Sequence, residues 1–432
     1  MMRLKKLSAF ITLFLLLTAA DLLSQHEMNP EILSLVKSPE VLHAIKNISF
    51  DYLMEREGRI YIVAGPSDVE TIEELGLPYR LETTSFRDRP SAALGIEGGI
   101  NGEFHTYAEL ERDIFDLQEK FPNLIKIHDI GDSVEGRNLY ALEITSHPDQ
   151  EILRPRSLFI GCHHAREWIS VEVPYLLAVH LCENYSRDGR IKALLESSEI
   201  WIIPLLNPDG LEYSIYFYRY WRKNRRLNSD GSYGVDLNRN YGYQWGYNDD
   251  GSSGNPNSGV YRGPGPFSEP ETQAVRDLLQ QYRFEALVSY HNYSQIIIFP
   301  WGYTTEQPPH YDLMFQLSRQ MSDLILQVNG RRYEYGQASD GLYVTNGDTT
   351  DWAYSLFSIP AFTIELPPPE ETLGGFFNAE NEILPIFLEN LPAALYLMEW
   401  AVASWSGETT KPKPSPESDL RTIYKTHTKI IK

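Results

Sequence analysis

The chain is poor in cysteine, and this scarcity limits how it can be stabilised. Only Cys162 and Cys182 occur among its 432 residues, too few for the disulfide framework of a small cross-linked domain. Hydrophobic residues make up 42% of the sequence, and a chain of this length can bury a large core without covalent cross-links. The two cysteines could be bridged or free, and we expect two buried thiols.

Positive charge is also scarce. The 38 Lys and Arg residues face 59 Asp and Glu residues, which gives a formal net charge of -21. The basic run at residues 218–226, taken alone, fits a solvated face or a nucleic-acid patch, but a polyanion would be repelled from most of this chain. Guanidinium groups also bind carboxylates through a bidentate fork. We therefore expect no nucleic-acid partner, and a use for these arginines in binding carboxylates.

Long apolar runs are absent, apart from a short one near the start. Residues 7–20 are mostly apolar, follow the basic start Met-Met-Arg-Leu-Lys-Lys and end in Thr-Ala-Ala, which is typical of a signal peptide. A membrane anchor is the alternative, but a bilayer requires about twenty apolar residues. We expect residues 1–20 to be a signal peptide, and the mature protein to be secreted, extracellular and without a stable membrane anchor.

One segment combines metal-ligating residues with an apolar run. Residues 158–168 read Leu-Phe-Ile-Gly-Cys-His-His-Ala-Arg-Glu-Trp, which places His164 three positions before Glu167, and a further imidazole, His291, lies far downstream. Two imidazoles and one carboxylate would leave a zinc ion one open position, as a catalytic site requires. Such a pair also arises by chance: His180 and Glu183 repeat the spacing, and we interpret them as a surface pair.

Two later apolar runs carry further polar residues at their ends. Residues 286–291 end in His291, and residues 359–366 contain Glu365. Runs of this kind are typical of buried strands in a sheet covered on both faces, and ligands bind beyond the carboxyl ends of such strands. A buried Glu is costly unless it is paired or functional. Glu365 could be a salt-bridged structural carboxylate or a general base beside a zinc-bound water.

Six motifs occur in order and together carry a family resemblance. They are His-Ala-Arg-Glu-Trp (164–168), Trp-Arg-Lys-Asn-Arg (221–225), Asp-Leu-Asn-Arg-Asn (236–240), Ser-Tyr-His-Asn-Tyr-Ser-Gln (289–295), Tyr-Val-Thr-Asn-Gly-Asp-Thr-Thr-Asp-Trp (343–352) and Phe-Thr-Ile-Glu-Leu (362–366). From near Phe104 to near Ser404 the chain resembles the zinc metallocarboxypeptidases of the A/B type, and looks closest to the bacterial carboxypeptidase T group. The resemblance implies an α/β fold, with a mixed, largely parallel twisted sheet, helices on both faces and a small α+β pro-domain in front.

The resemblance also implies the site residues. One Zn²⁺ per catalytic domain would be held by His164, Glu167 and His291. Glu365 would be the base and Arg222 would polarise the scissile carbonyl. Substrate-binding roles would fall to Arg166 in the outer subsites, Asn238 and Arg239 on the terminal carboxylate, and Tyr343 over the bound side chain, while Asn292 receives no role.

The same resemblance gives an expectation for the substrate. The position that selects the C-terminal side chain falls on Thr350, and Asp348 offers a carboxylate nearby. We expect removal of apolar and basic residues from peptide and protein C-termini, with Asp and Glu cleaved poorly. An inactive secreted binder of C-termini remains the alternative. An amidase or esterase would be expected to lack Arg222 with Asn238 and Arg239.

The remaining sequence suggests a zymogen with four parts. These are a signal peptide (1–20), a propeptide with linker (21–99), a catalytic domain (100–405) and a Pro-rich spacer with a basic tail (406–432). Residues 60–64 predict a strand and residues 66–75 a helix. We expect residues 83–102 to be an exposed linker, either cleaved or left intact. Residues 248–255 could bind calcium but lack regular ligand spacing, and we expect a solvated loop and a monomeric protein.

Overall fold

The computed structural model describes residues 31–42, 51–56, 58–64, 66–83, 101–150, 152–341, 344–369 and 375–405. The predicted signal peptide, most of the predicted linker, Tyr343 and the basic tail lie outside these ranges. The chain divides into two compact units, Met1–Asp88 and Arg89–Lys432. The division falls within the linker that the sequence predicted.

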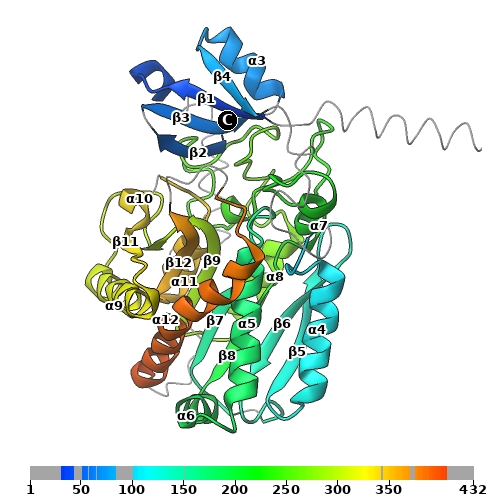
Figure 1. Cartoon of the computed structure of the whole chain (residues 1–432), viewed down its shortest axis with the longest axis vertical. Helices are drawn as coiled ribbons and strands as arrows, with labels where there is room; N and C mark the ends of the chain where they lie inside the picture. The colour runs from blue at the N-terminus through cyan, green and yellow to red at the C-terminus, as the bar shows by residue number, and fades with distance from the viewer. Residues whose placement is uncertain are drawn as a thin grey trace, which may run out of the picture. The chain divides into compact units, whose positions relative to one another are not determined.

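The described part of the first unit contains a small antiparallel sheet and the helix α3 (Figure 1). Its strands run in the order β2-β3-β1-β4, and the elements are β1 (Glu31–Val36), β2 (Asp51–Arg56), β3 (Arg59–Ala64), α3 (Pro66–Glu74) and β4 (Tyr79–Thr83). Ile60 and Ile62 of β3 alternate with outward residues and pack with Leu33, Leu35 and Ile72. The predicted strand and helix are both present, and α3 starts with a proline, which is tolerated in the first turn of a helix.

The second unit contains an eight-stranded sheet in the order β11-β10-β12-β9-β7-β8-β6-β5. Its strands are β5 (Ile125–Asp132), β6 (Asn138–Ile144), β7 (Arg156–Ile160), β8 (Glu199–Ile203), β9 (Ala286–Ser294), β10 (Ile296–Phe299), β11 (Glu334–Gln337) and β12 (Ala361–Pro369). The four central strands pair in parallel, and β5, β6 and β10 pair antiparallel with their inner neighbours. The predicted α/β fold with a mixed, largely parallel sheet is confirmed.

Helices cover both faces of this sheet (Figure 1). They are α4 (Tyr107–Lys120), α5 (Ile169–Asn184), α6 (Gly189–Ser197), α7 (Pro208–Tyr216), α8 (Pro270–Gln281), α9 (Tyr311–Asn329), α10 (Ala338–Gly341), α11 (Thr349–Phe357) and α12 (Ile383–Ser404), with short 3₁₀ turns η3 (Leu237–Arg239) and η4 (Glu380–Glu382). No described helix combines the length and apolar character needed to cross a bilayer.

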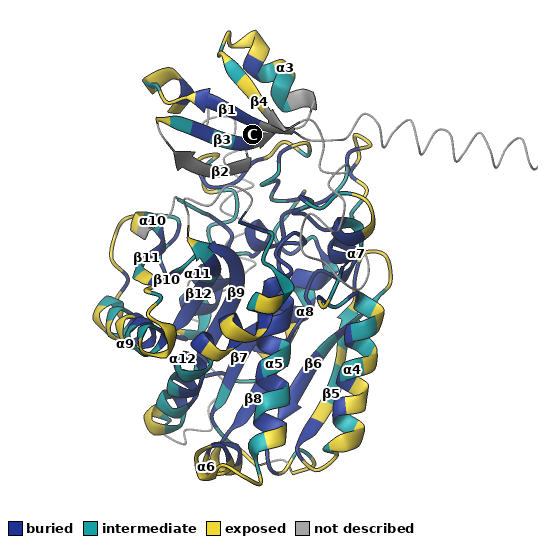
Figure 2. Ribbon diagram, in the orientation of Figure 1, coloured by how far each residue is buried: buried dark blue, intermediate teal, exposed yellow. Residues whose placement is uncertain are grey.

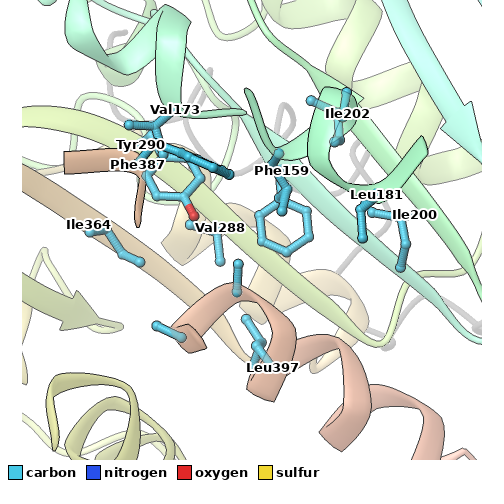
Figure 3. Close-up of a cluster of buried hydrophobic side chains, with 14 of the residues drawn as sticks. Phe159, Val173, Leu181, Ile200, Ile202, Val288, Tyr290, Ile364, Phe387 and Leu397 are labelled. Atoms are coloured by element: carbon cyan, nitrogen blue, oxygen red, sulfur yellow. The ribbon is translucent and has the colours of Figure 1, made fainter. Parts of the chain in front are cut away.

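The central strands are buried on both faces because their side chains alternate between two cores. Phe159, Val288 and Ile364 point into the cluster shared with α5 and α12 (Figure 3). Leu158 and Leu287 point into the opposite cluster, which includes residues of α8 and α11. Figure 2 shows these strands buried, with exposed residues on the outer faces of helices such as α4 and α9, on the edge strand β5 and in loops. The double burial explains why the strand sequences are almost continuously apolar.

The structure tests two expectations: that both cysteines are buried thiols, and that His291 and Glu365 stand at the ends of strands. Cys162 and Cys182 are both buried and free, as expected. The placement of His291 and Glu365 at strand ends was wrong, because β9 continues to Ser294 and β12 to Pro369. The pairing of β7 with β9 stops at Ile160 and Ser289, while β9 and β12 pair beyond that level. The rim therefore begins where β7 ends, inside the longer neighbouring strands.

Candidate active site

The turn after β7 positions the first two zinc ligands. A Cβ on Gly161 would lie 2.2 Å from the Ser170 carbonyl oxygen and 2.6 Å from that of Pro204, so only glycine allows the chain to pass. The backbone N–H of Ala165 donates to the carbonyl of Arg222 at 2.9 Å, which joins this turn to the basic segment. The turn leads directly into α5 at Ile169 and leaves His164 and Glu167 at the end of β7.

Three ligand groups converge from this turn and from β9. Glu167 Oε1 lies 2.7 Å from His164 Nδ1, Glu167 Oε2 lies 3.0 Å from His291 Nδ1, and the two Nδ1 atoms are 3.1 Å apart. All three side chains are buried. Two imidazole nitrogens and a carboxylate are the ligand set of catalytic zinc sites with an open fourth position. The residues that are present therefore fit one Zn²⁺, in agreement with the prediction.

Within the described residues no second group of three or more such ligands gathers. Glu183 instead pairs with Lys120 at 2.7 Å, with both side chains largely exposed. The prediction of a surface pair therefore holds for Glu183, whereas His180 is half-buried beside the Phe387 ring. In the loop at residues 248–255, which we expected to be solvated, the exposed Asp249 pairs with Arg262 at 2.7 Å, and we propose no calcium site there.

Asp236 orients both His164 and Arg222, a role that sequence reasoning missed. Its Oδ1 lies 3.2 Å from His164 Nε2, and its Oδ2 accepts from Arg222 Nε at 3.0 Å and forms an ion pair with Arg222 Nη2, 2.9 Å away. Burial alone would raise the pKa of this carboxyl, but Arg222 and His164 hold it well below its usual range. An ionised Asp236 fixes the His164 ring so that Nδ1 faces the metal position, as outer carboxylates do at metal sites. Its place in the motif at 236–240 was the available signal.

Asn292, to which the sequence assigned no role, also supports a ligand. Its backbone N–H donates to Glu167 Oε2 at 3.2 Å. Its side chain donates to the Pro367 carbonyl at 2.6 Å, which connects the far ends of β9 and β12. The residue therefore holds the Glu167 carboxylate in place through its backbone, which residue type alone cannot reveal.

Glu365 stands in the strand next to His291. In the parallel pairing of β12 with β9, Glu365 lies opposite His291. Burial and the nearby Glu167 carboxylate raise the pKa of Glu365 well above its usual range, and the guanidinium of Arg222 acts in the opposite direction. A carboxyl group beside a metal position is placed to accept a proton and return it.

A cavity joins the zinc ligands to the predicted substrate residues. It is lined by side chains from the turn after β7, the basic segment, η3, and the strands and loops around α11: His164, Arg222, Asn238, Arg239, His291, Ile298, Ala338, Thr345, Asp348, Thr350, Thr363 and Glu365. The structure therefore brings together most of the residues singled out from the sequence. Thr345 and Thr363 lie within two of the six motifs but were not singled out, because neither carries a charge, and Ile298 and Ala338 lie outside the motifs.

Asn238 and Arg239 are held rigidly at the cavity wall. Asn238 Oδ1 accepts from the backbone N–H of Thr349 at 3.0 Å and from its hydroxyl at 2.8 Å. Arg239 Nε donates to the Gly251 carbonyl at 2.7 Å, and Nη1 donates to the Asn238 carbonyl at 2.9 Å. The amide oxygen of Asn238 is thus occupied by donors, so its NH₂ group is the one available to an acceptor in the cavity.

Asp348 and Thr350 lie together on another part of the cavity wall, at the start of α11. Asp348 Oδ1 accepts from the Thr350 hydroxyl at 2.8 Å and from the Asp351 backbone N–H at 2.9 Å, while Oδ2 accepts from the Thr345 hydroxyl at 2.9 Å. A Cβ on Gly302 would lie 3.0 Å from Asp348 Oδ2. The carboxylate is therefore the N-cap of α11 and a fixed feature of the cavity.

Two other predicted substrate residues remain, Arg166 and Tyr343. Arg166 does not line the cavity: the guanidinium packs over the Phe376 ring, 4.2 Å from its centroid. The backbone carbonyl of Arg166 accepts from Arg219 Nη1 at 2.6 Å. Tyr343 lies outside the described residues, and its role stays a prediction.

Comparisons with known proteins agree with this geometry. The sequence profile of the zinc carboxypeptidase family matches residues 110–393. Zinc carboxypeptidase A 1 of Anopheles gambiae is 32% identical over 301 residues, covering 69% of this chain and 67% of that protein. Carboxypeptidase B of Astacus astacus is 32% identical over 287 residues, covering 65% and 91% of the two chains. The crystal structure of thrombin activatable fibrinolysis inhibitor matches with a TM-score of 0.72 at 25% identity, covering 88% of this chain and 100% of that chain.

The profile spans well over half of the sequence, and its span includes all three zinc ligands and Glu365. With an intact zinc-binding triad at the rim of the predicted sheet, the chain belongs to the zinc carboxypeptidase family and is a metallocarboxypeptidase of the A/B type, acting on peptide C-termini.

Proposed function

We propose that Glu365, Arg222, Asn238 and Arg239 carry out the hydrolysis of the C-terminal peptide bond in this enzyme. The observation that carries the proposal is their shared cavity with His164 and His291. Zinc, when bound, polarises a carbonyl and lowers the pKa of a coordinated water. Around the zinc position the chain supplies Glu365 as the base, Arg222 as the donor to the oxyanion, and Asn238 with Arg239 as the group that binds the terminal carboxylate.

Each residue has a step that fits its chemistry. The guanidinium of Arg239 and the NH₂ group of Asn238 bind the terminal carboxylate, which fixes the scissile bond relative to the ligands. Glu365 takes the proton of the attacking water and returns it to the leaving amine. Arg222, held by Asp236, donates to the carbonyl oxygen as negative charge develops there. Arg166 and Tyr343 act outside this group, on the outer subsites and over the bound side chain.

The substrate preference is proposed to be broad, covering apolar and basic C-terminal residues. Ile298 and Ala338 give the cavity apolar wall, and Asp348 gives it a carboxylate beside the neutral Thr350. Asp and Glu side chains would meet that carboxylate and be cleaved poorly. The likeness to the carboxypeptidase T group rests on this combination of Asp348 with Thr350, and it is part of the same proposal.

We also propose that the enzyme is secreted as a monomeric zymogen. Residues 1–20 would be the signal peptide, residues 21–99 the propeptide with its linker, 100–405 the catalytic domain and 406–432 a tail. In support, the crystal structure of thrombin activatable fibrinolysis inhibitor aligns with 88% of this chain, which is more than the second unit alone contains. Cleavage near Arg87 or Arg89 would release the catalytic part.

A peptide assay after mild proteolysis tests the proposal. The chain lacking residues 1–20 is treated with trypsin, and loss of single C-terminal residues from a peptide mixture is followed by mass spectrometry, with Glu365→Gln as the matched control. Stepwise loss of C-terminal residues that requires zinc and Glu365 is expected. A zinc-loaded protein that binds peptides but releases nothing would instead support a secreted binder of C-termini.

A further inference from the structure

We propose that His163, which is not a zinc ligand, is a positioning residue that connects the zinc ligand His291 with the carboxylate-binding Asn238. The inference rests on the proposed role of Asn238 and adds a third imidazole, beside those of His164 and His291, to the site. His163 is fully buried beside His164, and its ring lies nearly parallel to that of His291, with centroids 5.3 Å apart. Three side chains lie within hydrogen-bond distance of His163. Through them the ring is connected to the zinc ligand His291 on one side and to Asn238 on the other.

The first direction leads to the metal. His291 faces Glu167 and His164 with Nδ1, so a metal-bound neutral ring carries its proton on Nε2. Nε2 lies 2.9 Å from Ser289 Oγ, and Ser289 Oγ lies 3.1 Å from His163 Nδ1. The His291 N–H therefore donates to the Ser289 hydroxyl, which in turn donates to His163 Nδ1. His163 thus fixes the hydroxyl that fixes the orientation of His291.

The second direction leads to the substrate carboxylate. Because His163 Nδ1 accepts, the neutral ring carries its proton on Nε2. Nε2 lies 2.9 Å from Thr349 Oγ1 and 2.9 Å from the Tyr241 hydroxyl. The Thr349 hydroxyl, given an N–H donor on one side, donates to Asn238 Oδ1 at 2.8 Å. His163 therefore sets which end of the Asn238 amide faces the cavity.

The two directions form one chain in which every hydrogen bond points the same way. It runs from His291 through Ser289, His163 and Thr349 to Asn238, and each hydroxyl in it receives one bond and gives one. The Asn238 NH₂ group also lies 3.5 Å from His291 Nε2, but both atoms carry protons in this arrangement and cannot bond. That leaves the NH₂ group for an acceptor in the cavity. A histidine that served the core alone would not need partners on both sites.

The arrangement can be tested by cutting the chain at separate points. His163→Phe keeps a ring against His291 but removes both nitrogens, Ser289→Ala cuts only the metal direction, and Thr349→Val cuts only the carboxylate direction. Tyr241→Phe removes a buried hydroxyl that also contacts His163 but lies off the chain. Two readouts separate the directions: the zinc dissociation constant, and the dissociation constant of N-acetylphenylalanine for the metal-free protein.

His163→Phe is expected to weaken zinc binding by about tenfold or more, as loss of outer partners does at metal sites, and to weaken N-acetylphenylalanine binding as well. Ser289→Ala should affect zinc alone and Thr349→Val the carboxylate alone, while Tyr241→Phe changes either constant less than twofold. His163→Gln, whose amide can accept and donate, should restore part of both. Circular dichroism spectra and thermal midpoints establish that each variant is folded.

Several results would overturn the inference. His163→Phe could leave both constants within twofold of the parent, or Tyr241→Phe could reproduce its losses, which would indicate general damage to the core. If His163→Phe does not fold, Ser289→Ala and Thr349→Val decide, and no separation between their effects would reject the chain. Failure of the parent protein to bind zinc or N-acetylphenylalanine would instead count against the proposed function itself.

Discussion

Glu365 lies directly opposite His291 in the parallel pairing of β12 with β9. The candidate base and the third zinc ligand are therefore paired with each other across two neighbouring strands, and the hydrogen bonds between these strands set their separation. Sites built on strands are held more precisely than sites built on loops. The other two ligands come from the turn after β7. Strand β7 pairs with β9 on the side of β9 that faces away from β12. The sheet thus fixes the relative positions of all four residues.

The first prediction concerns the metal. His164→Ala removes one of three ligands and leaves Glu167 and His291 without a third, so tight zinc binding and peptidase activity should both be lost. Zinc content after dialysis, measured by elemental analysis, and activity before and after chelation check this. Lys120→Ala, which disrupts only the exposed pair with Glu183, is the control and should bind zinc normally. Full activity in a chelator-treated, metal-free sample would contradict the prediction.

The second prediction separates binding from chemistry at Glu365. Glu365→Gln keeps the shape of the side chain but cannot take a proton, so KM should change little while kcat falls by orders of magnitude. Steady-state kinetics on one good peptide, with zinc content checked to be unchanged, provide the measurement. An active Gln variant would mean that another residue is the base.

The third prediction concerns the outer carboxylate Asp236. Asp236→Asn keeps the size of the side chain but removes the charge that faces His164 Nε2 and Arg222. Zinc affinity should fall by about tenfold to a hundredfold, the usual effect of losing such a partner, and kcat should fall as Arg222 loses its hold. Competition with a chelator of known affinity gives the first quantity and kinetics the second. Unchanged zinc affinity would show that Asp236 only packs.

The fourth prediction is a pH dependence of stability at His105, outside the active site. Its Nδ1 lies 2.7 Å from Glu172 and its Nε2 lies 3.3 Å from Asp113. Burial alone would lower the pKa of His105, but these carboxylates raise it to about 9, above the ordinary 6.5. The folded state therefore holds this proton more tightly than the unfolded state, which stabilises the fold below pH 6.5 and ceases to do so as the pH rises through 9.

The difference between the pKa of His105 in the folded state and its ordinary value corresponds to about 3 kcal/mol in the free energy of unfolding. Urea unfolding of the parent and of His105→Gln at pH 6, 7.5 and 9.5 measures it. The parent should be more stable than the variant at pH 6 and should lose this extra stability by pH 9.5. Comparing the two proteins at each pH cancels the contributions of other titrating groups. If the two proteins lose stability in parallel, the proton on His105 is not what stabilises the fold.

The sequence was sufficient for the elements whose signal is local. The apolar runs around Phe159, Val288 and Ile364 predicted central strands because residues buried on both faces leave no alternation to misread. The sequence did not predict which outer strands of the sheet, such as β6, run antiparallel, because strand direction depends on partners far along the chain. The continuation of β9 past His291 was missed because Asn292 and Ser294 are polar, yet pairing with β12 keeps them in the ladder.

The site shows the same division between local and distant information. His164 and Glu167 could be recognised because a helical turn's spacing and a motif place them together. Asp236 and Thr349 act on residues 72 and 186 positions away along the sequence, His164 and His163, and only the folded sheet brings them into contact. No residue type or spacing marks a hydroxyl such as that of Ser289 as a support for a ligand.

The last prediction concerns specificity at Asp348. Three hydrogen bonds already occupy this carboxylate, and about four acceptor positions exist on an ionised carboxyl group. One position therefore remains for a Lys or Arg side chain, where a charge-assisted bond would contribute about 1.5–3 kcal/mol. Burial of a Leu or Phe side chain contributes about as much, roughly 1.5–3 kcal/mol. Neither class should dominate, and peptides ending in Glu should be cleaved poorly.

Asp348→Asn provides the test, because Asn is also a good helix N-cap and keeps α11 in place. It should lower kcat/KM for peptides ending in Arg by about tenfold to a hundredfold, the kinetic equivalent of the lost bond. Peptides ending in Leu or Phe should change less than threefold. Thr345→Val, which removes one donor to Asp348 but keeps its charge, is the control and should retain cleavage after Arg. A thousandfold preference of the parent enzyme for Leu over Arg, or for Arg over Leu, would show that one of the two contributions has been misjudged.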